Sequence, residues 1–266
     1  MNQANDTQAY GPWNPGIQSA VPKELQPLAT IFRPDNIFGG FAGFIELHDL
    51  TGLPPGELAV FRPQRLALHE LLIRVTADFA VPDGPRIEDL GINFRRIVGV
   101  LLSRHLEPQM DVIVAAYGGA RRSTQDSVAA AFREVGADCG WRPGHAADCE
   151  RLAGGGGDPS RSIALRALAR VMSALFATHG CAWGSRDLVM SLAADLACND
   201  SGSDAIGRAI EPLLLRAARS EGYRLLPRQM RPVIINTKGP SASGKSTLRP
   251  LQNKLARSGF SPECCF

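Results

Sequence analysis

The chain has 266 residues, of which 44% are hydrophobic and 21% charged, and its formal net charge is +3. This composition is typical of a globular protein with a hydrophobic core, and it excludes disordered, collagen-like and coiled-coil chains. No apolar run approaches the about 18 residues that span a bilayer, and the polar N-terminus lacks the pattern of a secretory signal. The six cysteines are unevenly spaced and indicate reduced thiols, so we expect a cytoplasmic protein without membrane contact.

The positive charge is concentrated near the C-terminus. Residues 222–258 contain eight Lys or Arg and no Asp or Glu, whereas residues 1–221 carry 21 basic and 25 acidic residues. A basic segment of this kind favours phosphate-bearing ligands. It predicts at most nonspecific contact with nucleic acid, because the sequence contains no nucleic-acid-binding motif.

Helical periodicity dominates the first half of the chain. Residues 1–21 have no periodicity and predict a loose arm. Residues 22–138 predict a helical region, with apolar stripes of helical spacing at 25–32, 68–79 and 90–102. The segment 108–117 fits either a helix or a buried strand over Asp111–Ala116, and we favour the helix.

A glycine-rich segment follows at residues 139–160. It contains four consecutive glycines, Gly154–Gly157, which are costly to fix in a regular element. The segment therefore predicts a long loop or linker. Its Cys139, His145 and Cys149 have spacings that match no common zinc site, so we expect free thiols there.

Helical periodicity resumes over residues 161–222. Three apolar stripes follow one another, at 164–176, 188–196 and 206–217, and Gly180 ends the first of them. The polar stretch Asn199–Ser203 has a turn-like composition, so we expect it to separate the second helix from the third.

The pattern changes at Pro232. Val233–Ile235 are consecutive β-branched residues, which is typical of a buried strand in a parallel sheet. Next comes GPSASGKST, Gly239–Thr247, which fits G-x-x-x-x-G-K-[ST] at every fixed position. Leu248–Ala256 then has helical spacing. Residues 231–258 therefore predict a strand, a phosphate-binding loop and a helix, in the order that the motif requires.

The chemistry of this motif is the binding of nucleotide phosphates. Its glycines let the backbone approach an anion closely, and the following helix directs its positive end at the phosphates. Lys245 supplies a charge to the β- and γ-phosphates, the Ser246 hydroxyl can ligate Mg²⁺, and Thr247 is placed to bond an α-phosphate. We therefore predict ATP and Mg²⁺ as cofactors, held by Gly239, Ser241, Ala242, Ser243, Gly244, Lys245, Ser246 and Thr247. The sequence identifies no catalytic residue.

These residues resemble the P-loop NTPase superfamily, over residues 232–257 or about a tenth of the chain. GPSASGKSTL is similar to the loops of small P-loop kinases, namely guanylate-kinase-like, gluconate- or adenylylsulfate-kinase-like and zeta-toxin-like enzymes, and also to the loop of ABC-type ATPases. An ABC domain normally has two or more strands before the loop, whereas helical stripes and one strand precede it here, which favours the kinases. The resemblance implies Mg-ATP-dependent phosphoryl transfer to an acceptor that the sequence does not identify.

The position of the motif departs from the family pattern. A P-loop is ordinarily the first βα unit of its domain, and only 19 residues without an aspartate follow Thr247. We expect a mainly α region followed by the first βα unit of an α/β P-loop domain, truncated in the given sequence, so that the chain lacks a complete active site. A permuted order, with Asp111–Ala116 as the acid-bearing strand, is the alternative.

Two other functions stay open at this point. One is a noncatalytic helical interaction module that carries a remnant P-loop. The other is a nucleotide-switched regulatory ATPase.

Overall fold

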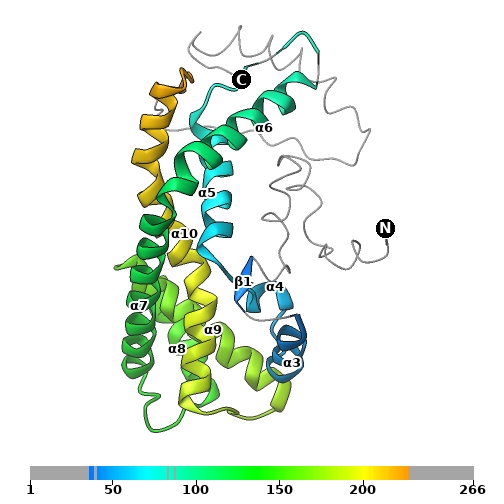
Figure 1. Ribbon diagram of the computed structural model, residues 1–266. Coiled ribbons are helices and arrows are strands. Elements are labelled where there is room, and N and C mark those ends of the chain that lie inside the picture. Colours follow the sequence, from blue (N-terminus) through cyan, green and yellow to red (C-terminus); the bar gives the residue numbers. More distant parts are fainter. Residues whose placement is uncertain (1–35, 39–40, 83, 87, 228–266) are drawn as a thin grey trace, which may run out of the picture.

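A computed structural model of the protein describes residues 36–38, 41–82, 84–86 and 88–227, and these form an elongated bundle of helices (Figure 1). The expectation of a mainly helical region is confirmed for these residues. The helices are α3 (Phe41–Thr51), α4 (Pro55–Leu58), α5 (Pro63–Asp78), α6 (Asp89–Leu101), α7 (Met110–Glu134), α8 (Pro143–Gly154), α9 (Pro159–His179) and α10 (Arg186–Ser220). A π-helical turn, η4 (Leu102–Leu106), and a 3-10 turn, η5 (Glu107–Gln109), connect α6 to α7. The predicted arm at 1–21 and the predicted P-loop unit at 231–258 lie outside the described residues.

The described sheet consists of two short strands, β1 (Ile37–Phe38) and β2 (Val60–Phe61), which pair antiparallel with Ile37 opposite Phe61. The side-chain amide of Asn199, on α10, fixes this hairpin. Its Oδ1 accepts the Phe61 N–H at 3.0 Å, and its Nδ2 donates to the main-chain oxygen of the residue before β2 at 2.7 Å. The amide satisfies main-chain groups as a neighbouring strand would, and it ties the hairpin to the bundle.

Two apolar clusters fill the two ends of the bundle. The first lies among α3, α8, α9, the end of α7 and the start of α10, with Phe132, Leu165 and Leu168 fully buried. The second lies among α5, α6, η4, the start of α7 and the end of α10, and includes Leu71 and Leu101. Helices α7 and α10 run side by side along the long axis and contribute to both clusters (Figure 1).

The helices begin and end at residues suited to those positions. Asp158 caps α9, where its carboxylate oxygens accept the N–H groups of Ser160 at 3.2 Å and Arg161 at 3.3 Å. Gly180 ends α9 in the left-handed conformation, with φ +70°, at the place where the sequence predicts its end. Ser185 caps α10 through its Oγ, which accepts the Leu188 N–H at 3.3 Å.

The structure differs from the loop expected at residues 139–160. Helix α8 occupies Pro143–Gly154 and buries His145, Ala146 and Cys149 against its neighbours. These three residues share one helical face, but histidine, alanine and cysteine form a weak apolar pattern beside a run of glycines. Within the expected loop, only residues 139–142 and the turn between α8 and α9 lie outside the helices, and in that turn Gly156 and Gly157 adopt φ values of +76° and +114°.

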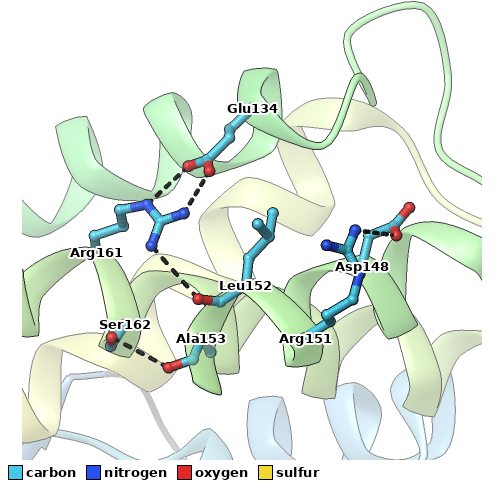
Figure 2. Close-up of polar contacts among 7 residues, drawn as sticks. All are labelled: Glu134, Asp148, Arg151, Leu152, Ala153, Arg161 and Ser162. Atoms are coloured by element: carbon cyan, nitrogen blue, oxygen red, sulfur yellow. Dashed lines mark hydrogen bonds and ion pairs between the residues drawn. The ribbon is translucent and has the colours of Figure 1, made fainter. Parts of the chain in front are cut away.

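Figure 2 shows the polar contacts that α9 makes with the end of α7 and with the end of α8. The Arg161 guanidinium, on α9, forms two hydrogen bonds with the Glu134 carboxylate of α7 and donates a third to the Leu152 carbonyl of α8 at 3.5 Å. The Ser162 Oγ donates to the Ala153 carbonyl at 3.4 Å. The last carbonyls of α8 thus find partners on α9, which fixes the end of the helix.

The favoured helix over residues 108–117 is confirmed, its strand alternative is excluded, and the expected turn at Asn199–Ser203 is wrong. The turn-like stretch Asn199–Ser203 lies inside α10, a continuous helix of 35 residues. Its polar side chains bond other elements of the bundle: Asn199 bonds the hairpin and Ser201 bonds Thr124 of α7. Gly202 packs against Tyr117 of α7. The segment Asp111–Ala116 belongs to α7 and is no strand, so the permuted order loses its acid-bearing strand.

Among the described residues, no helix is both long and apolar enough to cross a bilayer.

The close approach of α10 to α7 at Gly202 gives a stability prediction. A Cβ atom at Gly202 would lie 2.7 Å from Cε2 of the buried Tyr117 ring. We expect Gly202→Ala to lower the free energy of unfolding by about 1–3 kcal/mol, because overpacking outweighs the better helix propensity of alanine. Urea denaturation measures this change.

Gly119→Ala, on α7, is the matched control. A Cβ atom there meets nothing within 4 Å, so this variant should be more stable than the wild type by about 0.5–1 kcal/mol. A Gly202→Ala variant as stable as Gly119→Ala would contradict the packing described here.

Candidate functional site

The predicted nucleotide site lies outside the described part of the chain. Gly239, Ser241, Ala242, Ser243, Gly244, Lys245, Ser246 and Thr247 all fall within residues 228–266. The described residues do fix the place from which that segment starts. They also show which other side chains are grouped together.

The chain leaves the described bundle at the end of α5. Leu225 forms an isolated antiparallel bridge with Phe79. The Ala80 N–H donates to the Arg224 carbonyl at 2.9 Å, and the Leu226 N–H donates to the Asp78 carbonyl at 2.8 Å. The described chain therefore ends beside the C-terminal end of α5. The segment that carries the P-loop motif continues from this point.

Charged side chains surround this exit point. Glu221, just after α10, accepts hydrogen bonds from His105 Nε2 at 2.8 Å and from Arg104 Nη1 at 3.5 Å. Burial raises the pKa of Tyr223, as does Glu221, whereas Arg96 and Arg104 lower it. Arg104 is paired with Glu221, so the charges at this exit point partly balance one another.

A row of polar contacts joins α7 to α10 between the two apolar clusters. Arg121 Nη2 donates to Asp195 Oδ1 at 2.8 Å, and the hydroxyls of Thr124 and Ser201 are 2.6 Å apart. Burial raises the pKa of Asp195, and the Arg121 charge and hydrogen bond oppose that rise. We call Arg121, Thr124, Asp195 and Ser201 the polar belt. Its members satisfy one another, which suits a structural contact between two helices.

Two surface cavities accompany these contacts. One, of about 230 Å³, opens between α7 and α10 beside the polar belt and is lined by Arg121, Gln125, Ala129, Asp187, Met190, Ser191, Ala194 and Asp195. The other, of about 620 Å³, lies on α8 and α9, with Arg166 and Arg170 in its wall. Arg170 pairs with Glu57 and Arg121 with Asp195, so much of the charge in both walls is already neutralised.

The cysteines and histidines of the described residues form no reaction centre. No group of three His, Cys, Asp or Glu side chains in this part of the chain is placed to hold a metal ion. Burial raises the pKa of Cys149 to about 12 and that of Cys198 to about 11, so both thiols are protonated at neutral pH. His145 serves the start of α8, where its Nδ1 accepts the Arg142 N–H at 3.3 Å.

The structure adds one residue that the sequence patterns miss. Arg65, in the first turn of α5, is buried, and its Nε has no hydrogen-bond partner. It precedes Leu68, the first residue of the predicted stripe, by three positions. Helical spacing therefore places Arg65 on the buried face of α5. A hydrophobicity pattern does not reveal this burial, because arginine is counted as a charged residue.

Comparison of the chain with protein-family models, with curated proteins and with solved structures finds no match. The function of the chain is therefore argued from its own residues.

The polar belt gives a prediction that depends on pH. Arg121→Met leaves the partly buried Asp195 without its cation, so the folded-state pKa of Asp195 rises further above the unfolded value of about 3.9. We expect a loss of about 1 kcal/mol in the free energy of unfolding at pH 7, since the pair is about one-third exposed. The loss should shrink as the pH falls through the raised folded pKa, because a protonated Asp195 needs no cation.

Urea denaturation at pH 7 and pH 4 measures both effects. Arg208→Met is the control, because Arg208 forms an exposed ion pair with Asp204 on α10. That variant should stay within about 0.5 kcal/mol of the wild type at pH 7. An Arg121→Met loss that is as large at pH 4 as at pH 7 would show that packing, and not the Asp195 charge, causes it.

Proposed function

We propose that this protein binds Mg-ATP through Gly239–Thr247 and uses it for phosphoryl transfer, as the P-loop kinases that it resembles do. The complete G-x-x-x-x-G-K-[ST] pattern, between the apolar segment Val233–Ile235 and the helical segment Leu248–Ala256, carries the proposal. In this assignment Lys245 neutralises the β- and γ-phosphates, and the Ser246 hydroxyl ligates Mg²⁺.

The absence of a competing centre in the described residues supports this assignment. Cys149 and Cys198 are buried and protonated, and His145 is engaged in a helix cap. The half-buried Asp195 is occupied by Arg121. A nucleophile with an adjacent base, which covalent catalysis needs, is not among the contacts of this part of the chain. The chemistry is therefore assigned to the P-loop segment, and the helical bundle is its scaffold.

The attachment of that segment also supports the proposal. Eight residues separate Leu225, in the bridge to Phe79, from Val233. At about 3.3 Å per residue, the predicted strand starts within about 26 Å of the bridge. Arg104, at the exit point, is already paired with Glu221, so the support comes from this short connection.

Lys245→Ala tests nucleotide binding. We expect the affinity for Mg-ATP, measured by isothermal titration calorimetry, to fall about 10- to 100-fold, because a charge-assisted hydrogen bond to phosphate contributes about 1.5–3 kcal/mol. Circular dichroism should show unchanged helix content, since the bundle folds without this residue. Lys238→Ala, in the same basic segment but outside the motif, should keep the wild-type affinity. Equal affinity in all three proteins would refute the assignment.

Steady-state release of ADP separates the catalytic functions that the sequence leaves open from the noncatalytic ones. A phosphotransferase or regulatory ATPase releases ADP in a reaction that needs Mg²⁺ and is lost in Lys245→Ala. A nucleotide-binding module without catalysis binds Mg-ATP and releases no ADP. A helical interaction module with a remnant P-loop does neither.

A further inference from the structure

Arg65 is a buried arginine without an acidic partner. Only 5% of the residue is exposed, and its Nε is fully enclosed without a hydrogen-bond acceptor. Its side chain forms neither a hydrogen bond nor an ion pair with any described residue. A guanidinium has five N–H donors, and buried charges in proteins are ordinarily paired and hydrogen-bonded. Arg65 therefore has donors to offer to a group from outside the described residues.

The neighbours of Arg65 do not use those donors. Its Cζ lies 5.5 Å from the centre of the Phe61 ring, a cation–π contact that occupies no N–H group. His69 lies one helical turn further, and burial together with the Arg65 charge lowers its pKa, so it is neutral and offers no negative charge. The Glu70 carboxylate accepts the Ser203 hydroxyl of α10 instead. Burial lowers the pKa of Arg65 itself to about 10, so it stays charged at neutral pH.

A second arginine and the end of a long helix add positive charge at this end of α5. Arg62 is the N-cap of α5, a helix of 16 residues. Its Nε donates to the Ile37 carbonyl at 3.0 Å, its Cζ lies 5.4 Å from the centre of the Phe38 ring, and it forms no ion pair with a described carboxylate. The first amides of a helix carry a partial positive charge. Helical side chains lean toward the N-terminus, which brings the Arg65 guanidinium beside Phe61, just before the helix starts.

We propose that the N-terminal end of α5 binds a phosphate group, held by the Arg65 guanidinium. The planar Arg65 fork donates two parallel hydrogen bonds to phosphate oxygens, and the phosphate charge neutralises the buried guanidinium. Arg62 adds positive charge from the other face of the hairpin, where it lies against Phe38. The partly buried Phe61 ring lies beside the Arg65 guanidinium and gives an aromatic wall to an organic group that carries the phosphate. This site uses no residue of the P-loop motif, so it does not depend on the proposed function.

The test is the thermal unfolding of the full chain in a buffer free of oxyanions, with added inorganic phosphate or phenyl phosphate. The Lys245→Ala background weakens the binding of phosphate by the P-loop motif. The measurement therefore distinguishes a failure of the Arg65 site from a failure of the proposed nucleotide site. We expect phosphate at ten times its Kd to raise the Tm of Lys245→Ala by about 3–6 °C. Adding Arg65→Met, which keeps volume and removes the charge, should raise the Tm without phosphate and abolish the phosphate-induced rise.

Arg208→Met in the same background is the control, because it removes an exposed arginine and should keep the full phosphate-induced rise. A larger rise with phenyl phosphate than with inorganic phosphate identifies an organic phosphate as the ligand, and equal rises identify the free anion. The proposal is overturned if phosphate leaves the Tm of Lys245→Ala unchanged, or if Arg65→Met keeps the rise. Should Arg65→Met fail to fold, Arg65→Lys keeps the charge without the fork, and its phosphate affinity should fall at least tenfold. Unchanged affinity in that variant also overturns the proposal.

Discussion

The packing of α10 against α7 is the contact on which the rest of the bundle depends. The first half of α10 buries Val189, Leu192 and Ala193 in one apolar cluster, and its second half buries Ile206 and Ile210 in the other. Neither end of the bundle has a complete core without this helix. The polar belt crosses the same interface between the clusters, and its four side chains pair with one another there.

Residues of α10 also explain which parts of the fold could be predicted from the sequence. The apolar stripes at 188–196 and 206–217 are visible in the sequence, because leucine and isoleucine mark the buried face directly. The continuity of the helix between them is not, since Asn199, Ser201 and Gly202 have the composition of a turn. Their side chains act over long distances, on the hairpin and on α7. Helix α8 was not predicted, because its buried face consists of a histidine, an alanine and a cysteine and therefore forms no clear apolar stripe. The P-loop motif can be recognised without a structure, whereas the role of Arg65 depends on a burial that no local pattern records.

The proposed phosphate site and the end of the described chain lie at opposite ends of one helix. Arg65 and Arg62 stand at the start of α5, and Phe79, just after its end, pairs with Leu225, where the basic C-terminal segment begins. Helix α5 has 16 residues, which corresponds to a length of about 24 Å.

Hydrogen exchange of the full chain, with and without saturating Mg-ATP, tests the central claim most directly. If Gly239–Thr247 binds the nucleotide phosphates through its backbone N–H groups, the amides of these residues must exchange more slowly when Mg-ATP is present. The amides of residues 121–134, in the middle of the bundle on α7, serve as the internal reference and should exchange at the same rate in both conditions. Slower exchange confined to the motif and the segment that joins it to Leu225 is the result that we predict. Identical exchange of residues 239–247 with and without Mg-ATP would contradict the claim that this protein is a nucleotide-binding P-loop protein.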